Sequence, residues 1–294
     1  MHDWYHELVS PTPVVSVVVP VLDQAAGLAA TLEALAGQSL PESSFEVIVV
    51  DNGSVDDSLE VAAAWSARHP GARVVSETEL RGSYAARNRG LESSSAELIA
   101  FTDADCRPHP RWLERGLDAV SSSAAEVVAG RIEITFRCIR PNVWEYLDAA
   151  TWLDQRHYIE EHGFGTTANL FVRRRLFAAA GGFRAELASG GDYEFGQRVQ
   201  RHGARVHYAP DAVVAHPARA DAGAVLAKAR RVARGVQRLE RLGLLEHNRL
   251  SWTHFMPVRH YPAIPGQPLS PARWLAVAVL ANGLKYWSLL WRLV

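Results

Sequence analysis

Hydrophobic and polar residues follow two alternating patterns along the first hundred positions. Short runs rich in β-branched residues have the length of strands, and the stretches between them have helical spacing. In chain order the pattern predicts a strand over 15–19, a helix over 25–37, a strand over 46–50, a helix over 56–68, a strand over 73–75, a helix over 83–92 and a strand over 97–102. Ser54 followed by Asp57 resembles a capping box, and Gly90 is typical of a turn or helix end. The alternation indicates an α/β fold with a mainly parallel sheet.

Strands and helices continue beyond Pro110, with less regular spacing. The pattern predicts a helix to about Val120, a strand over 127–135, a helical segment over 144–158 punctuated by Trp and Tyr, a strand over 170–172, a helix over 192–202 and short strands at 206–208 and 213–214. The aromatic helical segment is suited to form the floor of a second binding site.

The last part of the chain changes character after Ala218. Apolar residues recur at helical spacing from Val225 to Leu239, and the basic residues Arg231, Arg234, Arg238 and Arg241 follow the same rhythm on another face. A Pro-rich connector over 257–271 precedes an apolar segment over 274–294, which Asn282, Lys285 and Arg292 interrupt. A membrane span needs about 20 mainly apolar residues, so this charge placement favours a helix that lies in the membrane interface.

Composition limits the function classes. The 294 residues include 31 Lys and Arg against 32 Asp and Glu, so no net charge attracts nucleic acid and we expect none as a partner. Cys106 and Cys138 are the only cysteines, which argues against a disulfide framework and favours a reducing compartment. The segment 1–7 has no cationic and apolar signal pattern, so we expect a cytoplasmic protein.

Polar residues follow three of the predicted strands at the point where each ends. Asp103 and Asp105 come directly after the strand over 97–102, while Pro20-Val21-Leu22-Asp23 and Asp51-Asn52-Gly53-Ser54 follow two others. The carboxyl ends of parallel strands meet at one edge of a sheet. We therefore expect one crevice that can hold a divalent metal and the diphosphate it neutralises.

Five motifs in order resemble those of family 2 glycosyltransferases. They are Val15-Ser16-Val17-Val18-Val19-Pro20, Val49-Val50-Asp51-Asn52-Gly53-Ser54, Ala86-Arg87-Asn88-Arg89-Gly90, Phe101-Thr102-Asp103-Ala104-Asp105 and Gly181-Gly182-Phe183. The resemblance covers about residues 14–217 and implies a GT-A fold and a nucleotide-diphosphate sugar donor, for which UDP is expected first. We expect a catalytic domain over 1–217, with a nucleotide-sugar half over 14–105 and an acceptor half over 106–217, and a helical extension over 218–294.

The resemblance assigns donor-binding roles residue by residue. Pro20 and Asp51 are expected to line the nucleoside pocket together with Asn52, and Asp23 lies where the family often has a polar pair. Arg87 and Asn88 are expected to support the pocket. For Asp51 the alternative is a turn residue or helix cap beside Gly53.

The resemblance also implies a metal site. Asp103 is expected near the ribose and Asp105 on the metal, which hard oxygen ligands and phosphates predict to be Mn²⁺ or Mg²⁺. His216 resembles the position from which GT-A enzymes supply a further metal or phosphate contact. The alternative for His216 is a purely structural histidine.

An inverting transfer needs a general base, and the resemblance assigns this role to Asp192. The family usually has Glu-Asp here, but this chain has Gly191-Asp192, and Glu194 is the fallback base. The alternative is that Asp192 only caps a helix, whose N-terminus we expect to hold its pKa low. Thr166, Thr167 and Asn169 are expected to face a sugar.

Absent motifs narrow the activity. The Gln-x-x-Arg-Trp run of processive members is missing, which predicts transfer of a single sugar, and no Gly-rich loop of a nucleotidyltransferase or dehydrogenase follows the first strand. A catalytically degenerate nucleotide-sugar-binding protein remains the alternative. The basic helix and the terminal Trp residues predict an anionic membrane surface and a lipid-linked or envelope-glycan acceptor, or else packing on the catalytic domain or in a homodimer.

Overall fold

The computed structural model describes residues 12–151, 153–245, 257 and 270–293. Its strands are β1 (Val15–Val21), β2 (Phe45–Asp51), β3 (Ala72–Ser76), β4 (Leu98–Phe101), β5 (Arg107–Pro108), β6 (Val127–Thr135), β7 (Leu170–Arg173) and β8 (Val206–Pro217). Its α-helices are α1 (Ala25–Ala36), α2 (Ser58–Ser66), α3 (Ser83–Glu92), α4 (Trp112–Ser123), α5 (Val143–Thr151), α6 (Gln155–His162), α7 (Arg174–Ala180), α8 (Gly191–Arg201), α9 (Ala222–Arg241) and α11 (Pro271–Leu293). Short 3₁₀ turns cover Glu42–Ser44 and Thr167–Asn169.

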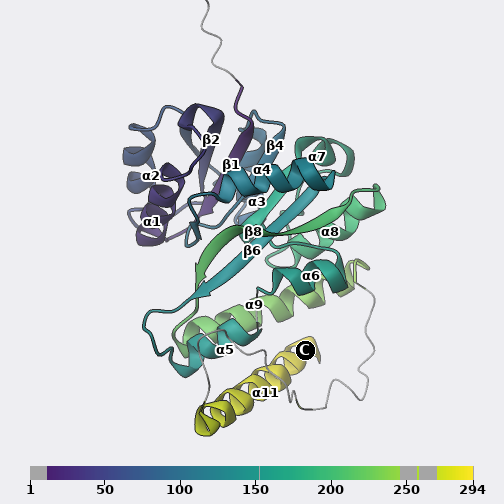
Figure 1. Ribbon diagram of the computed structural model, residues 1–294. Coiled ribbons are helices and arrows are strands. Elements are labelled where there is room, and N and C mark those ends of the chain that lie inside the picture. Colours follow the sequence, from purple (N-terminus) through teal and green to yellow (C-terminus); the bar gives the residue numbers. More distant parts are fainter. Residues whose placement is uncertain (1–11, 152, 246–256, 258–269, 294) are drawn as a thin grey trace, which may run out of the picture.

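The strands form one mixed sheet in the order β3-β2-β1-β4-β7-β6-β8-β5. β1 lies between β2 and β4 and is parallel to both, and β3 is parallel to β2. β7 is antiparallel to β4 and to β6, whereas β6 and β8 are parallel. The predicted α/β fold with a parallel first half is therefore confirmed. The antiparallel β7 joins that half to β6 and β8, whose long ribbons lie side by side in Figure 1.

Two hydrophobic cores lie on the two faces of the sheet. One contains Leu32 of α1, Trp65 of α2 and Trp112 of α4. The other contains residues of α3, α7 and α8, including Phe195, and it also takes in Leu239 of α9. The alternate side chains of β1 divide between these cores, as expected for a strand covered on both faces. The central strands therefore hold their C-terminal ends rigidly at one edge of the sheet.

The C-terminal helices α9 and α11 lie below β6 and β8 in Figure 1. α9 crosses this side of the molecule, with α5 and α11 next to it (Figure 1). These three helices share a smaller core that includes Leu147, Val225 and Val277. Gly235 of α9 lies so close to Ser189 that a Cβ atom there would be 2.7 Å from the Ser189 carbonyl oxygen. α9 is thus fitted directly against the rest of the chain.

Several sequence-based expectations need correction. The capping box is wrong, because the Ser54 hydroxyl accepts from the backbone N–H of Asp23 and α2 begins only at Ser58. Gly90 lies inside α3, where a Cβ would approach Val18 to 2.3 Å. The segment 144–158 forms two helices, β8 is one strand with a register shift, and α7 was not predicted.

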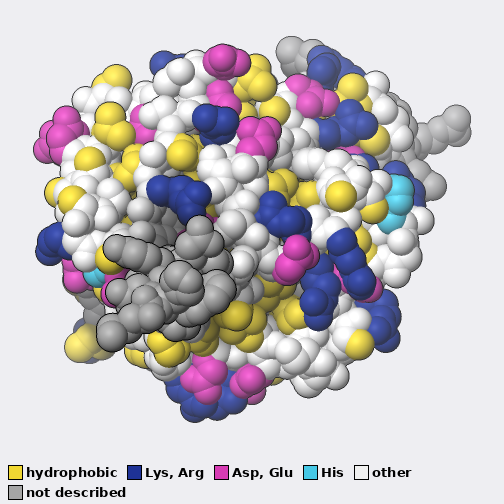
Figure 2. Space-filling view, turned by 90° about the horizontal axis from the view of Figure 1, so that it is seen from above, with side chains coloured by type: hydrophobic (Ala, Val, Ile, Leu, Met, Phe, Trp, Pro, Cys, Tyr) yellow, Lys and Arg dark blue, Asp and Glu magenta, His cyan; other side chains and the backbone are white. Residues whose placement is uncertain are grey.

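The surface carries charges of both signs. Figure 2 shows basic and acidic side chains interspersed over the face seen from above, in keeping with the balanced composition. Among the described residues, no helix is long and apolar enough to cross a membrane. Segment 1–7 and most of the connector over 257–271 lie outside the described residues.

Candidate active site

A cleft of about 1010 Å³ opens at the C-terminal ends of the central strands. We call its first side the strand wall, formed by Pro20, Asn52, Asp103, Asp105 and His216. We call its second side the helix wall, formed by Tyr158, Phe164, Asp192, Tyr193, Lys228 and Arg231. Arg87 and Tyr84 of α3 also line the cleft. The chain thus brings together the ends of β1, β2, β4 and β8 with α6, α8 and α9. The sequence predicted that the ends of β1, β2 and β4 meet at one crevice.

The loop that carries Asp103 and Asp105 is held from below by α1. The Thr31 hydroxyl lies 2.9 Å from the carbonyl oxygen of Ala104 and 2.6 Å from that of Cys106. Gly27 allows the close approach, because a Cβ there would be 2.9 Å from the Ala104 oxygen. This support leaves both aspartate side chains about one-third exposed at the cleft.

Arg87 connects the two walls electrostatically. Its Nη2 lies 2.6 Å from Oδ1 of Asp103, and its guanidinium lies over the Tyr84 ring. Burial opposes the charge, but the carboxylates of Asp103 and Asp192 outweigh it and raise the pKa of Arg87. The buried Arg87 Nε has no hydrogen-bond partner within the described part of the chain. A buried cation with an unused donor beside the cleft is suited to bind an oxygen of a ligand.

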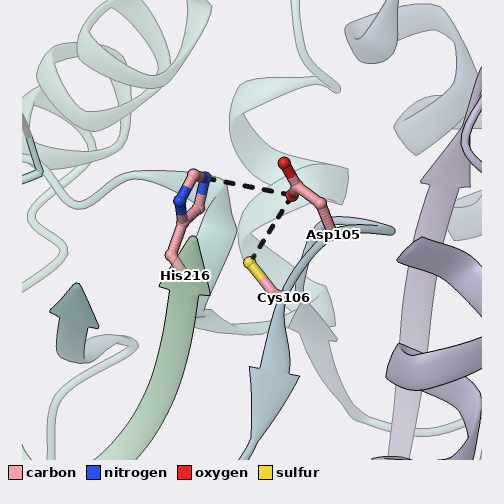
Figure 3. A group of neighbouring side chains, drawn as sticks. All are labelled: Asp105, Cys106 and His216. Atoms are coloured by element: carbon pink, nitrogen blue, oxygen red, sulfur yellow. Dashed lines mark hydrogen bonds and ion pairs between the residues drawn. The ribbon is translucent and has the colours of Figure 1, made fainter. Parts of the chain in front are cut away.

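Asp105, Cys106 and His216 form a cluster whose ligand atoms all lie within 4.8 Å of one another. His216 lies at the end of β8 and turns its ring toward the Asp105 carboxylate, with 3.9 Å between Nε2 and Oδ1 (Figure 3). The other ring nitrogen, Nδ1, lies 2.9 Å from the carbonyl oxygen of Pro217. Because a carbonyl can only accept, Nδ1 donates this hydrogen bond, which leaves Nε2 as the ring nitrogen that faces Asp105. The predicted pairing of Asp105 with His216 is therefore present.

Cys106 is the member of this cluster that sequence reasoning missed. Its thiol lies 4.0 Å from Asp105 Oδ1 and is fully buried. Burial raises the pKa of Cys106 well above its ordinary value, and the neighbouring aspartates add to the effect. Because thiolate is the form that binds metal, the cluster offers one carboxylate and one imidazole.

The other polar residues after β1 and β2 mainly bind the backbone. The Asp51 carboxylate accepts the N–H groups of Gly53 and Ser54, and the Asp23 carboxylate accepts that of Val55. Neither side chain lines the cleft. This is the turn geometry that the sequence left open for Asp51.

Asn52 shapes the loop between β3 and α3. Its amide nitrogen donates to the carbonyls of Glu77 and Leu80, while its oxygen accepts from the N–H of Gly82. Leu80, Arg81 and Gly82 all line the cleft. Asn52 thereby sets the outline of the strand wall at this end.

The Gly181-Gly182-Phe183 turn is held from two sides. The Asn88 amide both donates to and accepts from the backbone of Phe183, each at 2.8 Å. Arg198 donates to the carbonyls of Ala180, Gly181 and Gly182. Glu194 is only 2% exposed and pairs with Arg198 and Arg184, away from the cleft lining. Asn88 and Glu194 thus stabilise this turn without lining the cleft.

Asp192 projects into the cleft from the first turn of α8. Thr167 donates to its Oδ1 at 3.2 Å. Burial raises the pKa of Asp192 above its ordinary value of 3.8, and the charge of Arg87 only partly opposes this. The expectation that the helix N-terminus holds this pKa low is therefore wrong, because desolvation outweighs the helix charges.

Tyr84 explains why Gly191 stands where Glu is usual. The Tyr84 hydroxyl oxygen accepts the backbone N–H groups of Gly191 at 3.0 Å and Asp192 at 3.3 Å. A Cβ on residue 191 would be 2.7 Å from the Tyr84 ring. Burial also raises the pKa of Tyr84, so the hydroxyl stays protonated. A tyrosine at 84 thus requires a glycine at 191.

Aromatic rings make up much of the helix wall. Phe164 stacks on Tyr158 with ring centroids 5.0 Å apart and meets Tyr193 edge-on at 5.5 Å. The aromatic helical segment of the sequence therefore does reach the cleft. Thr167 and Thr166 also line it. Asn169 does not, because its buried amide binds the carbonyls of Arg131 and Ala212 and accepts from the Trp112 indole.

Known proteins resemble this chain over most of its length. The model of glycosyl transferase family 2 matches residues 16–185. The glycosyltransferase AglE of Haloferax volcanii is 38% identical over 243 residues, which are 81% of this chain and 78% of that protein. The pre-mycofactocin glycosyltransferase of Mycobacterium tuberculosis is 32% identical over 210 residues, which are 69% of this chain but 42% of that protein.

Solved structures show the same GT-A architecture. A mannosyltransferase from Pyrobaculum calidifontis, in complex with GDP-Man and Mn²⁺, superposes with a TM-score of 0.60 at 20% identity and covers 96% of this chain and 73% of that one. S. aureus TarS in complex with UDP-GlcNAc gives a TM-score of 0.57 at 19% identity over 77% of this chain and 72% of that one. At these identities the likeness establishes the fold.

Proposed function

Because this chain belongs to glycosyl transferase family 2, we propose that it transfers one sugar from a nucleotide-diphosphate sugar to an acceptor hydroxyl with inversion. The observation that carries the proposal is that a carboxylate of raised pKa, Asp192, and the Asp105–His216 pair face the same cleft from its two walls. A base and a site for the leaving group are the two elements that direct displacement needs.

The strand wall is suited to the donor. We assign the nucleoside to the end that Pro20 and Asn52 border and the ribose to Asp103. Asp51, proposed from the sequence as a base contact, holds the Gly53–Ser54 turn behind this end. Arg87, with its unused Nε donor, is assigned to an oxygen of the donor. Neighbours of this fold hold GDP-Man or UDP-GlcNAc, so the base of the nucleotide is left to experiment.

Asp105 and His216 fit a divalent metal. Their ligand atoms lie 3.9 Å apart, which is compatible with two ligands that each lie about 2.1 Å from one ion. The hydrogen bond from Nδ1 to the Pro217 carbonyl orients the imidazole, as in many metal sites. When bound, Mn²⁺ or Mg²⁺ would stabilise the charge of the departing diphosphate as a Lewis acid.

Asp192 is assigned the role of general base. The acceptor hydroxyl gives its proton to the Asp192 carboxylate as its oxygen bonds to the anomeric carbon, and the bond from that carbon to the diphosphate oxygen breaks. A raised pKa makes the carboxylate a stronger base than an exposed aspartate. Thr167 orients the carboxylate through its hydrogen bond, and the Tyr158–Phe164 pair forms an apolar surface for the acceptor.

The C-terminal helix supports a peripheral position on a cytoplasmic membrane face and a lipid-linked acceptor. Trp274, Leu275 and Val279 of α11 are exposed, Val279 by 63%. These residue types are common on helices that lie in the membrane interface. Flotation of the full chain with anionic vesicles tests this, with Val279→Asp and Leu275→Asp as the weakened variant. If the intact chain stays at the bottom of the gradient, the membrane assignment is wrong.

The structure removes the main argument for the alternative of a catalytically degenerate binding protein. That alternative depended on Gly191, and the Tyr84 ring accounts for this glycine by packing alone. Transfer activity therefore remains the better interpretation.

Thermal unfolding with UDP, GDP and dTDP, each with and without Mn²⁺, tests the donor site on the wild type and on Asp105→Ala. A ligand that binds the native state raises the melting temperature by mass action. We expect a metal-dependent shift with one nucleotide that the variant loses. No shift with any nucleotide would contradict the proposal.

A further inference from the structure

A cationic cluster lies on the cleft beyond the proposed metal site. Lys228 of α9 is 8% exposed, and its Nζ lies 3.1 Å from Oδ1 of Asp148 on α5, which is 2% exposed. Arg219, in the segment between β8 and α9, brings its Nη1 to 3.4 Å from the other Asp148 oxygen, which also accepts the Arg219 backbone N–H. Asp148 thereby fixes two cations that both line the cleft.

Arg219, Lys228 and Arg231 all line the cleft, and Arg231 lies one turn from Lys228 on α9. The Asp148 carboxylate holds the first two of these cations in place. Burial lowers the pKa of Lys228 and the charge of Arg219 adds to this effect, so that the pKa is about 8 despite the attraction of Asp148. Three cations on one cleft lining, two of them held in place, match the chemistry of a phosphate group.

The position of the cluster agrees with this chemistry. Arg219 follows His216 by three residues, and Asp105, His216 and Arg219 all line one cleft. Arg231, which was predicted to contact anionic lipid, also lines the cleft, and the lipid contact stays a prediction. The basic face of α9 is therefore partly turned toward the site.

We propose that Arg219, Lys228 and Arg231 form a phosphate-binding subsite of the cleft, oriented by Asp148. The proposal rests on the proposed function, since it takes the cleft as the place of sugar transfer. The phosphate has two potential sources: the diphosphate of the donor nucleotide, or a phosphate carried by the acceptor. Both present the same oxygens to the same cations.

Isothermal titration on the full chain distinguishes these sources. The first arm compares a nucleoside diphosphate with its nucleoside, UDP with uridine and GDP with guanosine, in Mn²⁺. The second arm compares a short prenyl phosphate with the matching prenyl alcohol. Arg231→Gln is the main variant because its side chain is exposed and its loss should not affect folding. The control is Arg241→Gln, an exposed arginine at the end of the same helix that does not line the cleft.

Lys228→Met together with Asp148→Asn removes the inner cation and its carboxylate together, and the half-buried Arg219 keeps an amide oxygen as a hydrogen-bond acceptor at residue 148. We expect Arg231→Gln to weaken binding of the phosphorylated compound in one arm about tenfold, and the double variant to weaken it more. Binding of the compound without phosphate should not change, and Arg241→Gln should bind both compounds as the wild type does. If the affinity falls in the first arm, the subsite binds the diphosphate of the donor. If it falls in the second arm, the subsite binds a phosphate of the acceptor.

Equal binding of both phosphates by the wild type and Arg231→Gln overturns the subsite while the proposed function stands. A wild type that binds no nucleotide in either form contradicts the proposed function itself. A raised Kd for every ligand alike, phosphorylated or not, would mark a structural defect and also overturn the subsite.

Discussion

The two walls of the cleft use their polar side chains differently. On the strand wall and just behind it, Asp23, Asp51 and Asn52 bind the backbone of their own loops and thereby give the cleft its outline. On the helix wall, the half-buried Asp192 and the buried Lys228 have shifted pKa values and line the cleft. The strand wall is proposed to bind the donor and the helix wall to supply the base. Substitutions on the two walls should therefore impair binding and catalysis separately.

The largest expected effect comes from Asp192→Asn, which removes the proposed base and leaves the strand wall intact. We expect kcat to fall about 10² to 10⁴-fold, while the melting-temperature shift with the donor nucleotide persists. Initial rates with a nucleotide-sugar donor, measured beside the exposed variant Asp118→Asn, provide the check. A variant that keeps normal turnover would show that the helix wall does not supply the base.

Asp105→Ala affects the opposite wall. The proposed metal loses its carboxylate ligand, which should weaken nucleotide binding in Mn²⁺ about 100-fold and leave binding in EDTA unchanged. Titration calorimetry with and without metal measures both values. If the affinity falls equally under the two conditions, the Asp105–His216 pair is not a metal site.

Asn88→Ala should act on stability more than on ligand binding. The change removes both bonds to the Phe183 backbone, and leaving these buried groups unpaired should cost about 1 to 3 kcal/mol in the free energy of unfolding. Denaturant unfolding, with Arg89→Ala at the next, exposed position as the control, measures this cost. Lost nucleotide binding at unchanged stability would instead make Asn88 a ligand contact.

The smallest expected effect tests the raised pKa of Asp192. A carboxyl whose folded pKa lies above its unfolded value stabilises the protein below that unfolded value, and the contribution is lost as the pH rises through the folded pKa. At neutral pH the buried charge is therefore a cost, so Asp192→Asn should raise the melting temperature by about 2 °C. Melting curves at pH 3.5 and pH 7 are compared; a gain that does not grow with pH would contradict the shift.

Much of the fold and part of the site could be predicted from the sequence because both depend on local pattern. The strand over 127–135 and the helix over 83–92 have the predicted bounds, and Asp103 and Asp105 lie at the cleft because strand ends meet at one edge. The motifs also indicated that His216, far away in the chain, joins Asp105.

The roles of individual polar groups depended on contacts between distant segments. Whether Asn88 faces a ligand or Phe183, and whether Glu194 faces the cleft or Arg198, follows from packing that no local spacing encodes. The direction of the Asp192 pKa shift was wrong for the same reason, since burial is a property of the assembled site. The sequence by itself determined the α/β order, the family and the strand-end carboxylates. Only the tertiary structure, which brings α3 and α9 to the cleft, decided that the Tyr84 ring leaves no room for a side chain at Gly191 and that Lys228 becomes a buried cation paired with Asp148.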